Sequence, residues 1–360
     1  MSDYTYLLAQ ALVQAGDEVH VWAPCSAESS VATAEVVVHR MAGNFGFADL
    51  ARMGQEIDSW SPNRILVQYV PHAFGWKAMN LPFCFWLSRR HIPVWVMFHE
   101  VVFPLHWLQR PSHQLLGVIT RLMALLTVRS SERVFVSTPA WSKFVRQLGG
   151  TRVSPVWLPV PSNIHTAVDA QRVAALRQEL TGTGSVTIGH FGTYSQALCP
   201  MLQTMVTDLL AADPCRYFLL LGRNSQALVA QILAAAPALA KRIIAPGGLS
   251  AEELSLHLAV CDVVVQPYPD GITTRRGSSM APLALGIPVV TNFGVLSESL
   301  WRESGAVVLA ESYSSRAFVE TTEELLGCRE RVASLRARAI SLYSSRFSMQ
   351  CTLQAIKGSV

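Results

Sequence analysis

Short runs of apolar, β-branched residues alternate with helical stretches along the first half of the chain. The strand-like runs lie at 18–22, 36–38, 65–69, 94–98 and 134–137. Helical spacing of apolar positions marks 1–15, where Tyr4, Leu8 and Leu12 share one face, and also 81–90 and 112–128. Strands that alternate with helices are typical of βαβ units, so we predict a parallel sheet covered by helices.

A proline-rich segment at 151–163 separates this half from the next, because its three prolines disfavour helix and suit an extended connector. Buried-strand runs then resume at 186–190, 217–221, 242–245, 262–266, 288–291 and 306–309. We therefore predict two tandem doubly wound α/β domains, at 1–155 and 156–335. An amphipathic helix in 336–360 closes the chain, with packing back onto the first domain as one option.

Strand ends are where chemistry is expected in such domains. Ligands of open α/β sheets bind outside the carboxyl ends of the strands, and two such domains facing each other enclose a cleft there. Residues that directly follow the predicted strands are therefore the first candidates for a site.

Composition narrows the class of protein. Of the 360 residues, 50% are hydrophobic and only 15% are charged, which excludes a disordered chain. The net charge is +4 without a block of like charges, so no nucleic-acid partner is expected. No apolar stretch reaches the roughly 18 residues of a membrane span, and no signal peptide is seen. We expect a cytoplasmic protein.

A contact with the inner membrane face stays open as an option. Five of the nine tryptophans are clustered, at Trp60, Trp76, Trp86, Trp95 and Trp107. Such a cluster fits an aromatic belt at the level of lipid headgroups, and it fits an aromatic core or a substrate cleft better.

No metal site or resident cofactor is expected. The seven cysteines are scattered without a C-x-x-C pair, so they predict reduced core thiols. The chain has no D-x-D or H-E-x-x-H motif to hold a metal. It also lacks G-x-G-x-x-G after a strand, the P-loop and G-x-S-x-G, which argues against a dehydrogenase, a P-loop NTPase and an α/β-hydrolase.

The most informative stretch is 261–279, which reads C-D-V-V-V-Q-P-Y-P-D-G-I-T-T-R-R-G-S-S. A buried strand runs into a Pro-Asp-Gly turn and then into Arg275 and Arg276, just before a predicted helix start. Free N–H groups at a helix start and the forks of two arginines are suited to a diphosphate. Two surface arginines beside a serine N-cap are the alternative, and the stretch alone does not decide between them.

Three further strand ends carry glycine: 189–194 (G-H-F-G-T-Y), 221–224 (L-G-R-N) and 246–250 (P-G-G-L-S). Glycine lets the backbone approach a ligand closely. Taken alone, each of these loops is more often a plain turn between a strand and a helix.

Together these motifs resemble a known family. The spacing D-V-V-V-Q-P-Y-P-D-G-x-x-x-R-R-x-S-x-M-x-x-L-A-x-G-x-P-V-V-T, from Asp262 to Thr291, is similar to the donor half of bacterial GT-B glycosyltransferases of the retaining family four (group 1). In the first half, V-Q-Y-V-P-H with Gly75, N-L-P-F and M-F-H-E resemble the acceptor domain of the same enzymes. The resemblance covers nearly the whole chain.

The resemblance implies an α/β protein of the GT-B class, with two Rossmann-like domains facing a cleft. Its activity would be metal-independent transfer of a sugar from a nucleotide diphosphate sugar to an acceptor hydroxyl, with retention at the anomeric carbon. The nucleotide sugar is a substrate and not a cofactor. The acceptor stays open among a glycan, a lipid-linked molecule and a small molecule.

The resemblance also implies roles for individual residues. Arg275 and Arg276 would hold the departing diphosphate. His99 would touch the donor sugar or orient the acceptor hydroxyl, with His72 and Glu100 on the same acceptor side. The remaining residues implied on the donor side are Gly192, Thr193, Arg223, Gly248, Leu249, Asp270, Gly277, Ser278 and Ser279.

The chain departs from the family pattern in two places. Thr273 and Ala281 occupy the positions of a paired-glutamate motif that holds the donor sugar and the ribose, with Asp270 nearby as a substitute. The family also usually opens with a strand before its first helix, and without that strand 19–21 and 65–69 lack a neighbour between them. These departures leave a degenerate binding protein open as an alternative. An epimerase or phosphorylase is a second alternative, because such enzymes can share the same architecture.

Overall fold

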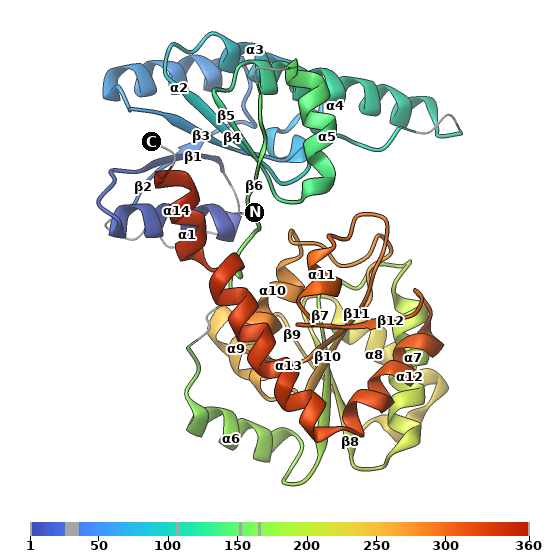
Figure 1. Ribbon diagram of the computed structural model, residues 1–360. Helices are drawn as coiled ribbons and strands as arrows, with labels where there is room; N and C mark the ends of the chain where they lie inside the picture. The colour runs from blue at the N-terminus through green and yellow to red at the C-terminus, as the bar shows by residue number, and fades with distance from the viewer. Residues whose placement is uncertain (1, 26–35, 106–107, 151–152, 165–166, 359–360) are drawn as a thin grey trace. The chain divides into compact units, whose positions relative to one another are not determined.

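The computed structural model divides the chain into two compact units, which are described separately (Figure 1). The first unit comprises Met1–Pro159 with Ala355–Val360, and the second comprises Val160–Gln354. The structure describes residues 2–25, 36–105, 108–150, 153–164 and 167–358.

The second unit contains one parallel sheet of six strands. They are β7 (Val186–Phe191), β8 (Arg216–Leu221), β9 (Ile243–Gly247), β10 (Val263–Gln266), β11 (Val289–Asn292) and β12 (Val308–Ala310). Their order in the sheet is β9-β8-β7-β10-β11-β12, which is the order of a Rossmann sheet. The direction of winding reverses between β7 and β10, so this pair marks the place where ligands bind in such sheets.

Helices cover both faces of this sheet. They are α6 (Ala170–Leu180), α7 (Cys199–Ala212), α8 (Ser225–Ala235), α9 (Ala251–Ala259), α10 (Gly277–Ala284), α11 (Leu300–Glu303), α12 (Ser315–Leu326) and α13 (Arg329–Leu342). Strand β8 shows why both faces are buried: Phe218 and Leu220 enter one apolar cluster, and Leu219 and Leu221 enter another. A continuous apolar run, rather than an alternating one, is therefore what the sequence of this strand requires.

After α13 the chain continues through a π-helical turn, Tyr343–Phe347, into α14 (Met349–Lys357). The end of α14 is counted with the first unit. There the ammonium of Lys357 donates hydrogen bonds to the carbonyl oxygen of Ala15 at 2.8 Å and to the carboxylate of Asp17 at 3.0 Å.

The first unit contains a parallel sheet of four strands in the order β3-β4-β5-β6. These strands are β3 (Ile65–Tyr69), β4 (Val94–Phe98), β5 (Arg133–Val136) and β6 (Val156–Trp157). The helices of this unit are α1 (Ser2–Gln14), α2 (Phe47–Trp60), α3 (Leu81–Ser88), α4 (Pro111–Arg129) and α5 (Ser142–Gly149). All five residues of β4 are buried, as expected for a strand covered on both faces.

A separate sheet of two parallel strands, β1 (His20–Pro24) and β2 (Val37–Met41), completes the first unit. Within the described part of the chain, β1 pairs only with β2, and β3 pairs only with β4. The two sheets nevertheless share an apolar core, in which Met41 belongs to the same cluster as Val67 and Tyr69. Within the described residues, side-chain packing, and not a backbone ladder, therefore joins the two sheets.

One expectation about side chains is corrected. All seven cysteines are free, but only Cys84 and Cys261 are buried. The prediction of core thiols is wrong for the others, because single cysteines at exposed loop positions or half-buried helix positions leave no periodic signal. Among the clustered tryptophans, Trp95 is buried in the core and Trp60 stacks on the ring of His20. Trp107 lies outside the described residues.

The described strands of the first unit are divided between two sheets and have four edges, at β1, β2, β3 and β6, whereas the second unit has two, at β9 and β12. We therefore predict that the first unit opens more readily than the second. An edge strand lacks one set of ladder hydrogen bonds, and local opening requires less free energy where fewer such bonds must break. We expect limited proteolysis, followed by mass spectrometry of the fragments, to cut the first unit while the second stays intact. Cleavage within the second unit at the same protease dose or earlier would contradict this.

Candidate active site

Two side chains bridge β7 and β10 at the reversal of the sheet. His190 Nδ1 donates a hydrogen bond to the carbonyl oxygen of Val265 at 2.9 Å, and Gln266 Nε2 donates to that of Phe191 at 2.8 Å. The Nε2 atom of His190 and the Oε1 atom of Gln266 are buried and have no hydrogen-bond partner within the described part of the chain. Two buried acceptors are thus left open at the switch point of the sheet.

The start of α10 is fixed to the end of β10. The hydroxyl of Tyr268 makes hydrogen bonds with Ser278 Oγ at 2.7 Å and with Ser279 Oγ at 2.8 Å. Gln266 Nε2 also donates to the carbonyl oxygen of Ser278 at 3.0 Å. Burial raises the pKa of Tyr268, so its phenol stays protonated and uncharged. The N–H groups of Gly277 and Ser278, in the first turn, are held in place by this network.

Arg275 and Arg276 lie half-buried at this helix start. The guanidinium carbon of Arg276 lies 4.9 Å from the centre of the Tyr268 ring, a cation–π contact. Within the described residues no carboxylate forms an ion pair with Arg276. An uncompensated cation next to the positive end of a helix dipole favours an anion, so this corner is electrostatically prepared for a phosphate.

A buried carboxylate holds the loop that carries the two arginines. Glu298 is 8% exposed and accepts hydrogen bonds from the Thr274 hydroxyl at 2.7 Å, the Thr274 N–H at 3.1 Å and the Trp301 indole at 2.7 Å. Gly271 has φ +83° and lies against Gly294, where a Cβ atom would come within 2.2 Å of the Gly294 nitrogen. The course of this loop therefore depends on one carboxylate and on two glycines in contact.

Sequence reasoning missed Glu298. It is the only acidic residue between Asp270 and Glu303, in a stretch that contains three arginines. That isolation was the available signal, but it does not reveal that the carboxylate turns inward to bind backbone.

Neither position of the paired-glutamate motif offers a carboxylate. Ala281 is 1% exposed and packs in an apolar cluster, and Thr273 is fully buried with no hydrogen-bond partner for its hydroxyl among the described residues. Asp270 is half-buried at the preceding turn, where its carbonyl oxygen accepts a hydrogen bond from the Leu296 N–H at 3.1 Å.

The glycine loops after β7 and β8 touch each other. The Gly192 N–H donates to the carbonyl oxygen of Leu221 at 3.1 Å. Gly222 has φ +123°, and a Cβ atom there would lie 2.3 Å from the Gly192 carbonyl oxygen, so a side chain is excluded. Thr193 and Arg223, which directly follow, are exposed at this edge. After β9, Gly248 is exposed and Leu249 is half-buried.

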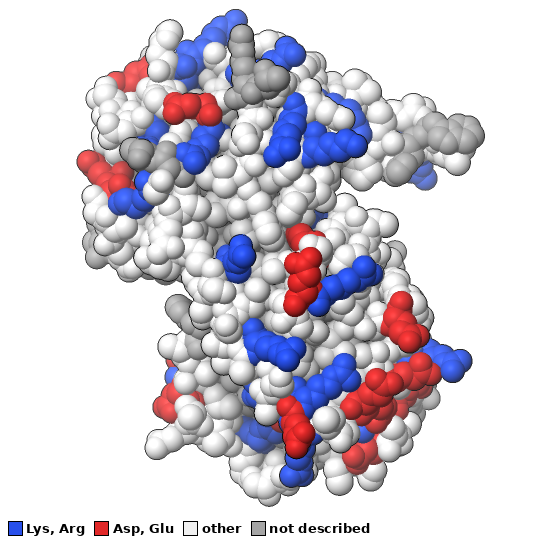
Figure 2. All heavy atoms as spheres, viewed as in Figure 1, with Lys and Arg blue, Asp and Glu red and all other residues white. Residues whose placement is uncertain are grey.

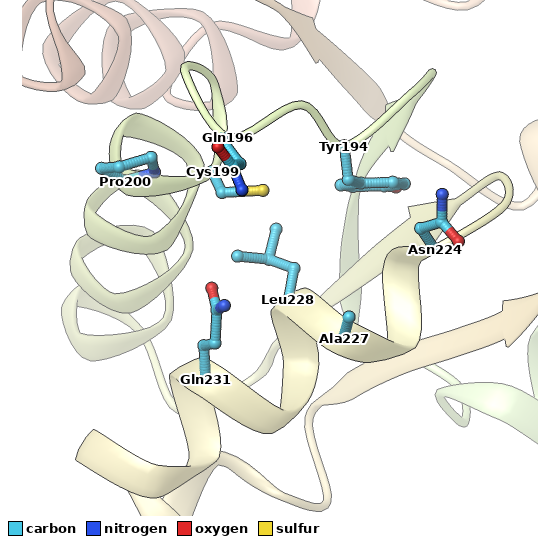
Figure 3. Close-up of a pocket in the computed structure, with 8 residues that line it drawn as sticks. All are labelled: Tyr194, Gln196, Cys199, Pro200, Asn224, Ala227, Leu228 and Gln231. Atoms are coloured by element: carbon cyan, nitrogen blue, oxygen red, sulfur yellow. The ribbon is translucent and has the colours of Figure 1, made fainter.

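A pocket of about 360 Å³ opens beside these loops, between the first turns of α7 and α8 (Figure 3). Its lining residues are Tyr194, Gln196, Cys199, Pro200, Asn224, Ala227, Leu228 and Gln231. The sequence predicted Thr193 and Arg223 as site residues, whereas the pocket is lined by their immediate neighbours, Tyr194 and Asn224. The hydroxyl of Tyr194 donates to the carbonyl oxygen of Leu221 at 3.0 Å, which fixes the ring.

In the first unit, His99 directly follows β4. Its Nε2 donates to Oε1 of Gln68 on β3 at 2.8 Å, and its ring contacts the Tyr4 ring edge-on at 5.0 Å between centroids. Burial lowers the pKa of His99 to about 4, so the imidazole is neutral near pH 7 and its Nδ1 can accept a hydrogen bond. Sequence reasoning missed both neighbours, Gln68 and Tyr4.

The other two acceptor-side residues lie near by along the chain. His72 is exposed in a 3₁₀ turn, Pro71–Phe74, that follows β3, and Glu100 is exposed next to His99. The structure therefore groups the predicted donor-side residues at the carboxyl edge of the second unit's sheet, and His72, His99 and Glu100 at that edge of the first unit's sheet. Within the described residues, no group of three or more His, Cys, Asp or Glu side chains could hold a metal ion.

Comparison with known proteins gives one family and several solved structures. Residues 1–161 match the family model of the glycosyl transferase 4-like domain. Anabaena Alr3699/HepE, solved in complex with UDP, is 20% identical, with a TM-score of 0.64 over 90% of this chain and 85% of that chain. Sucrose-phosphate synthase from Thermosynechococcus elongatus is 13% identical, with a TM-score of 0.75 over 99% and 91%.

A third similar structure is WaaG, a glycosyltransferase involved in lipopolysaccharide biosynthesis. It is 11% identical to this chain, with a TM-score of 0.66 over 99% of this chain and 95% of that one. No curated protein matches the chain.

Proposed function

We propose that this chain, which has the GT-B fold and a glycosyl transferase 4-like first domain, transfers a sugar from a nucleotide diphosphate sugar to an acceptor hydroxyl. The predicted fold class, with two Rossmann-like domains, and the resemblance to group 1 glycosyltransferases are both confirmed by these likenesses. The further proposals are that the transfer retains the anomeric configuration and needs no metal.

The observation that carries the proposal is the corner formed by Arg275, Arg276 and the start of α10. A nucleotide diphosphate is the anion that fits it, because the arginine forks and the backbone N–H groups supply donors on two sides. Similar structures that contain UDP and UDP-glucose support a nucleotide sugar as the donor.

The proposed chemistry needs no protein nucleophile. The bond between the anomeric carbon and the phosphate oxygen breaks, and its electron pair goes to that oxygen. The acceptor oxygen bonds to the same face of the anomeric carbon, while the acceptor proton passes to the leaving phosphate oxygen. Arg275, Arg276 and the helix start stabilise the charge that grows on the diphosphate.

The test is transfer by the full chain with a panel of uridine, adenosine, guanosine and thymidine diphosphate sugars. Release of the nucleoside diphosphate identifies the donor, with and without EDTA. Proton NMR of the first product, before it can mutarotate, gives its anomeric configuration. If EDTA stops the release, the proposal that no metal is needed is wrong. A product with inverted anomeric configuration would contradict retention.

Replacing His99 with alanine should lower turnover by about tenfold or more while nucleotide affinity stays within about twofold, because His99 is proposed to orient the acceptor hydroxyl or touch the sugar, away from the diphosphate. The measurements are kcat with the identified donor and Kd for the nucleoside diphosphate. His91→Ala is the matched control, since His91 is exposed and precedes the same strand. Equal losses in kcat and in nucleotide affinity would contradict this role of His99.

A second candidate function is a degenerate member that binds a nucleotide sugar without turnover. It is favoured by one observation, the absence of a carboxylate at Thr273 and Ala281. Nucleotide binding without release from any donor would support it. An epimerase would interconvert donor sugars without releasing nucleoside diphosphate, and a phosphorylase would need inorganic phosphate, so the same panel separates both.

The acceptor and the location are also proposals. A glycan, a lipid-linked molecule or a small molecule each fits an acceptor hydroxyl. We propose a cytoplasmic protein with a peripheral contact to the inner membrane face. In the described part of the chain, no helix is long and apolar enough to cross a membrane.

A further inference from the structure

Two exposed aromatic side chains meet in the turns that follow β2 and β3. Phe47, the first residue of α2, is 71% exposed, and Trp76, in the turn after β3, is 43% exposed. Their rings contact each other edge-on, with 5.7 Å between centroids and 75° between ring planes. Neither ring belongs to the apolar core cluster of this unit, so packing does not account for the pair. We name Phe47 and Trp76 the aromatic corner.

The turns that present the aromatic corner are strained. Trp76, Lys77 and Ala78 have φ of +51°, +53° and +67°, and Phe45 in the other turn has φ +56°. A residue with a side chain has a higher free energy at positive φ, and it stays there only where the surrounding contacts hold it. Strain of this kind gathers at sites that bind ligands.

A buried amide holds the two turns together. Asn80 is fully buried, and its Nδ2 donates hydrogen bonds to the carbonyl oxygens of Phe45 at 3.0 Å and Phe74 at 2.8 Å. Gly75 lies directly on the other turn, where a Cβ atom would come within 2.4 Å of the Asn44 Cβ. The aromatic corner is therefore preorganised, and a ligand that binds it does not have to order these turns.

The aromatic corner is continuous with the acceptor-side residues. His72 lies in the same loop after β3 as Trp76. The N–H of His99, directly after β4, donates to the carbonyl oxygen of Tyr69 at the end of β3 at 3.0 Å. The loop that carries Trp76 and the proposed acceptor residue His99 therefore start from adjacent strand ends.

Charge near the aromatic corner is low. In the two turns, 42–47 and 71–78, Lys77 is the only Lys, Arg, Asp or Glu residue. On the side of the first unit visible in Figure 2, basic and acidic side chains are both present and are interspersed. An anionic bilayer is bound by several basic side chains beside apolar ones, so it is a poorer occupant of these turns than a neutral ligand.

We propose that the aromatic corner binds a neutral sugar ring of the acceptor. This inference rests on the proposed transfer and deepens it by naming the chemistry of the acceptor. One face of a pyranose presents C–H groups with a slight positive charge, which the negative face of an aromatic ring attracts. Two rings at 75° offer a face to the flat side of the sugar and a wall to its edge.

The test is saturation-transfer difference NMR of the full chain with neutral oligosaccharides of glucose, galactose, mannose and N-acetylglucosamine, without any nucleotide sugar. We expect at least one to bind, with the strongest transfer to the C–H protons on one face of a ring. Trp76→Gly should weaken this binding about tenfold or more, because it removes the indole from the contact. Glycine adopts positive φ readily, so the turn and the melting temperature should be preserved.

Phe85→Ala is the matched control, because Phe85 is 46% exposed on α3, outside the two turns, and its loss should not affect oligosaccharide binding. Octyl glycosides of the bound sugar distinguish the two sources of such a ring. Tighter binding of the octyl glycoside than of the free sugar would indicate a lipid-linked acceptor, and equal binding would indicate a free glycan.

Equal oligosaccharide binding by Trp76→Gly and the unchanged chain would overturn the proposal, as would absence of binding to every oligosaccharide. Binding to phosphatidylcholine vesicles that Trp76→Gly abolishes, without oligosaccharide binding, would assign the aromatic corner to a lipid surface instead. No donor is present in these experiments. A chain that transfers sugar but binds no oligosaccharide would therefore contradict this inference alone and leave the proposed transfer intact.

Discussion

Replacing Arg276 with alanine is expected to lower the turnover number about 100-fold or more. As the sugar–oxygen bond breaks, negative charge grows on the diphosphate, and a donor aimed at that charge stabilises the transition state more than the ground state. Loss of one such donor typically costs about 3 to 4 kcal/mol of transition-state stabilisation. Arg275→Ala is expected to act in the same way if its guanidinium also reaches the diphosphate, so at least one of the two variants should show the full loss.

Arg276→Lys should restore only part of the rate, because an ammonium is a point charge and cannot bind two phosphate oxygens as a planar fork does. Arg302→Ala is the matched control: its guanidinium stacks on Phe293 at 3.6 Å, so it removes a comparable cation–π contact away from the helix start. Rates are compared at equal melting temperature. If both Arg275→Ala and Arg276→Ala transferred sugar at near-normal rates, the diphosphate would have to bind at another site, and the proposed mechanism would be wrong.

The loop behind these arginines gives a related expectation that separates position from charge. Glu298→Gln keeps the size of the side chain but replaces one acceptor oxygen with an NH₂ donor, which faces the Thr274 donors or the Trp301 indole. Glu298 is a positioning residue, so the change should lower kcat and also raise the nucleotide Kd, since the whole loop shifts. A loss confined to kcat would contradict this role.

The strands were predictable because buried strands appear in the sequence as short runs of apolar residues. The run at 65–69 and the run at 94–98 coincide with β3 and β4, since a parallel strand covered on both faces needs consecutive apolar residues. The arginines after β10 were predictable for a related reason: a turn sequence after a buried strand places the next residues at the ligand-binding edge.

The supporting contacts were not predictable in the same way. Glu298 reaches Thr274 across 24 residues, and His190 reaches Val265 across 75. Such pairs depend on which strands become neighbours, and a single sequence does not encode that order locally.

His190 should make the second unit less stable in mild acid. Burial lowers the pKa of His190 to about 4 in the folded state, against about 6.5 when the chain is unfolded. The unfolded chain therefore binds more protons below pH 6.5, and the stability that the neutral imidazole preserves is lost as the pH falls from 6.5 toward 4. Between pH 7 and pH 5 this amounts to about 2 kcal/mol in the free energy of unfolding.

The measurement is urea unfolding at pH 7 and pH 5, monitored by pulsed hydrogen exchange and mass spectrometry. Peptides from β7 and β10 report on the second unit by itself.

His190→Gln is the informative variant, because the amide of glutamine can still donate to the Val265 carbonyl oxygen but does not titrate. Its decrease in stability between the two pH values should be smaller than that of the unchanged chain by about 2 kcal/mol. Peptides from the first unit, where His99 is still present, should show the same pH dependence in both proteins. An identical decrease for β7 and β10 in the variant would mean that His190 is protonated in the folded state as easily as in the unfolded chain, and would contradict the lowered pKa.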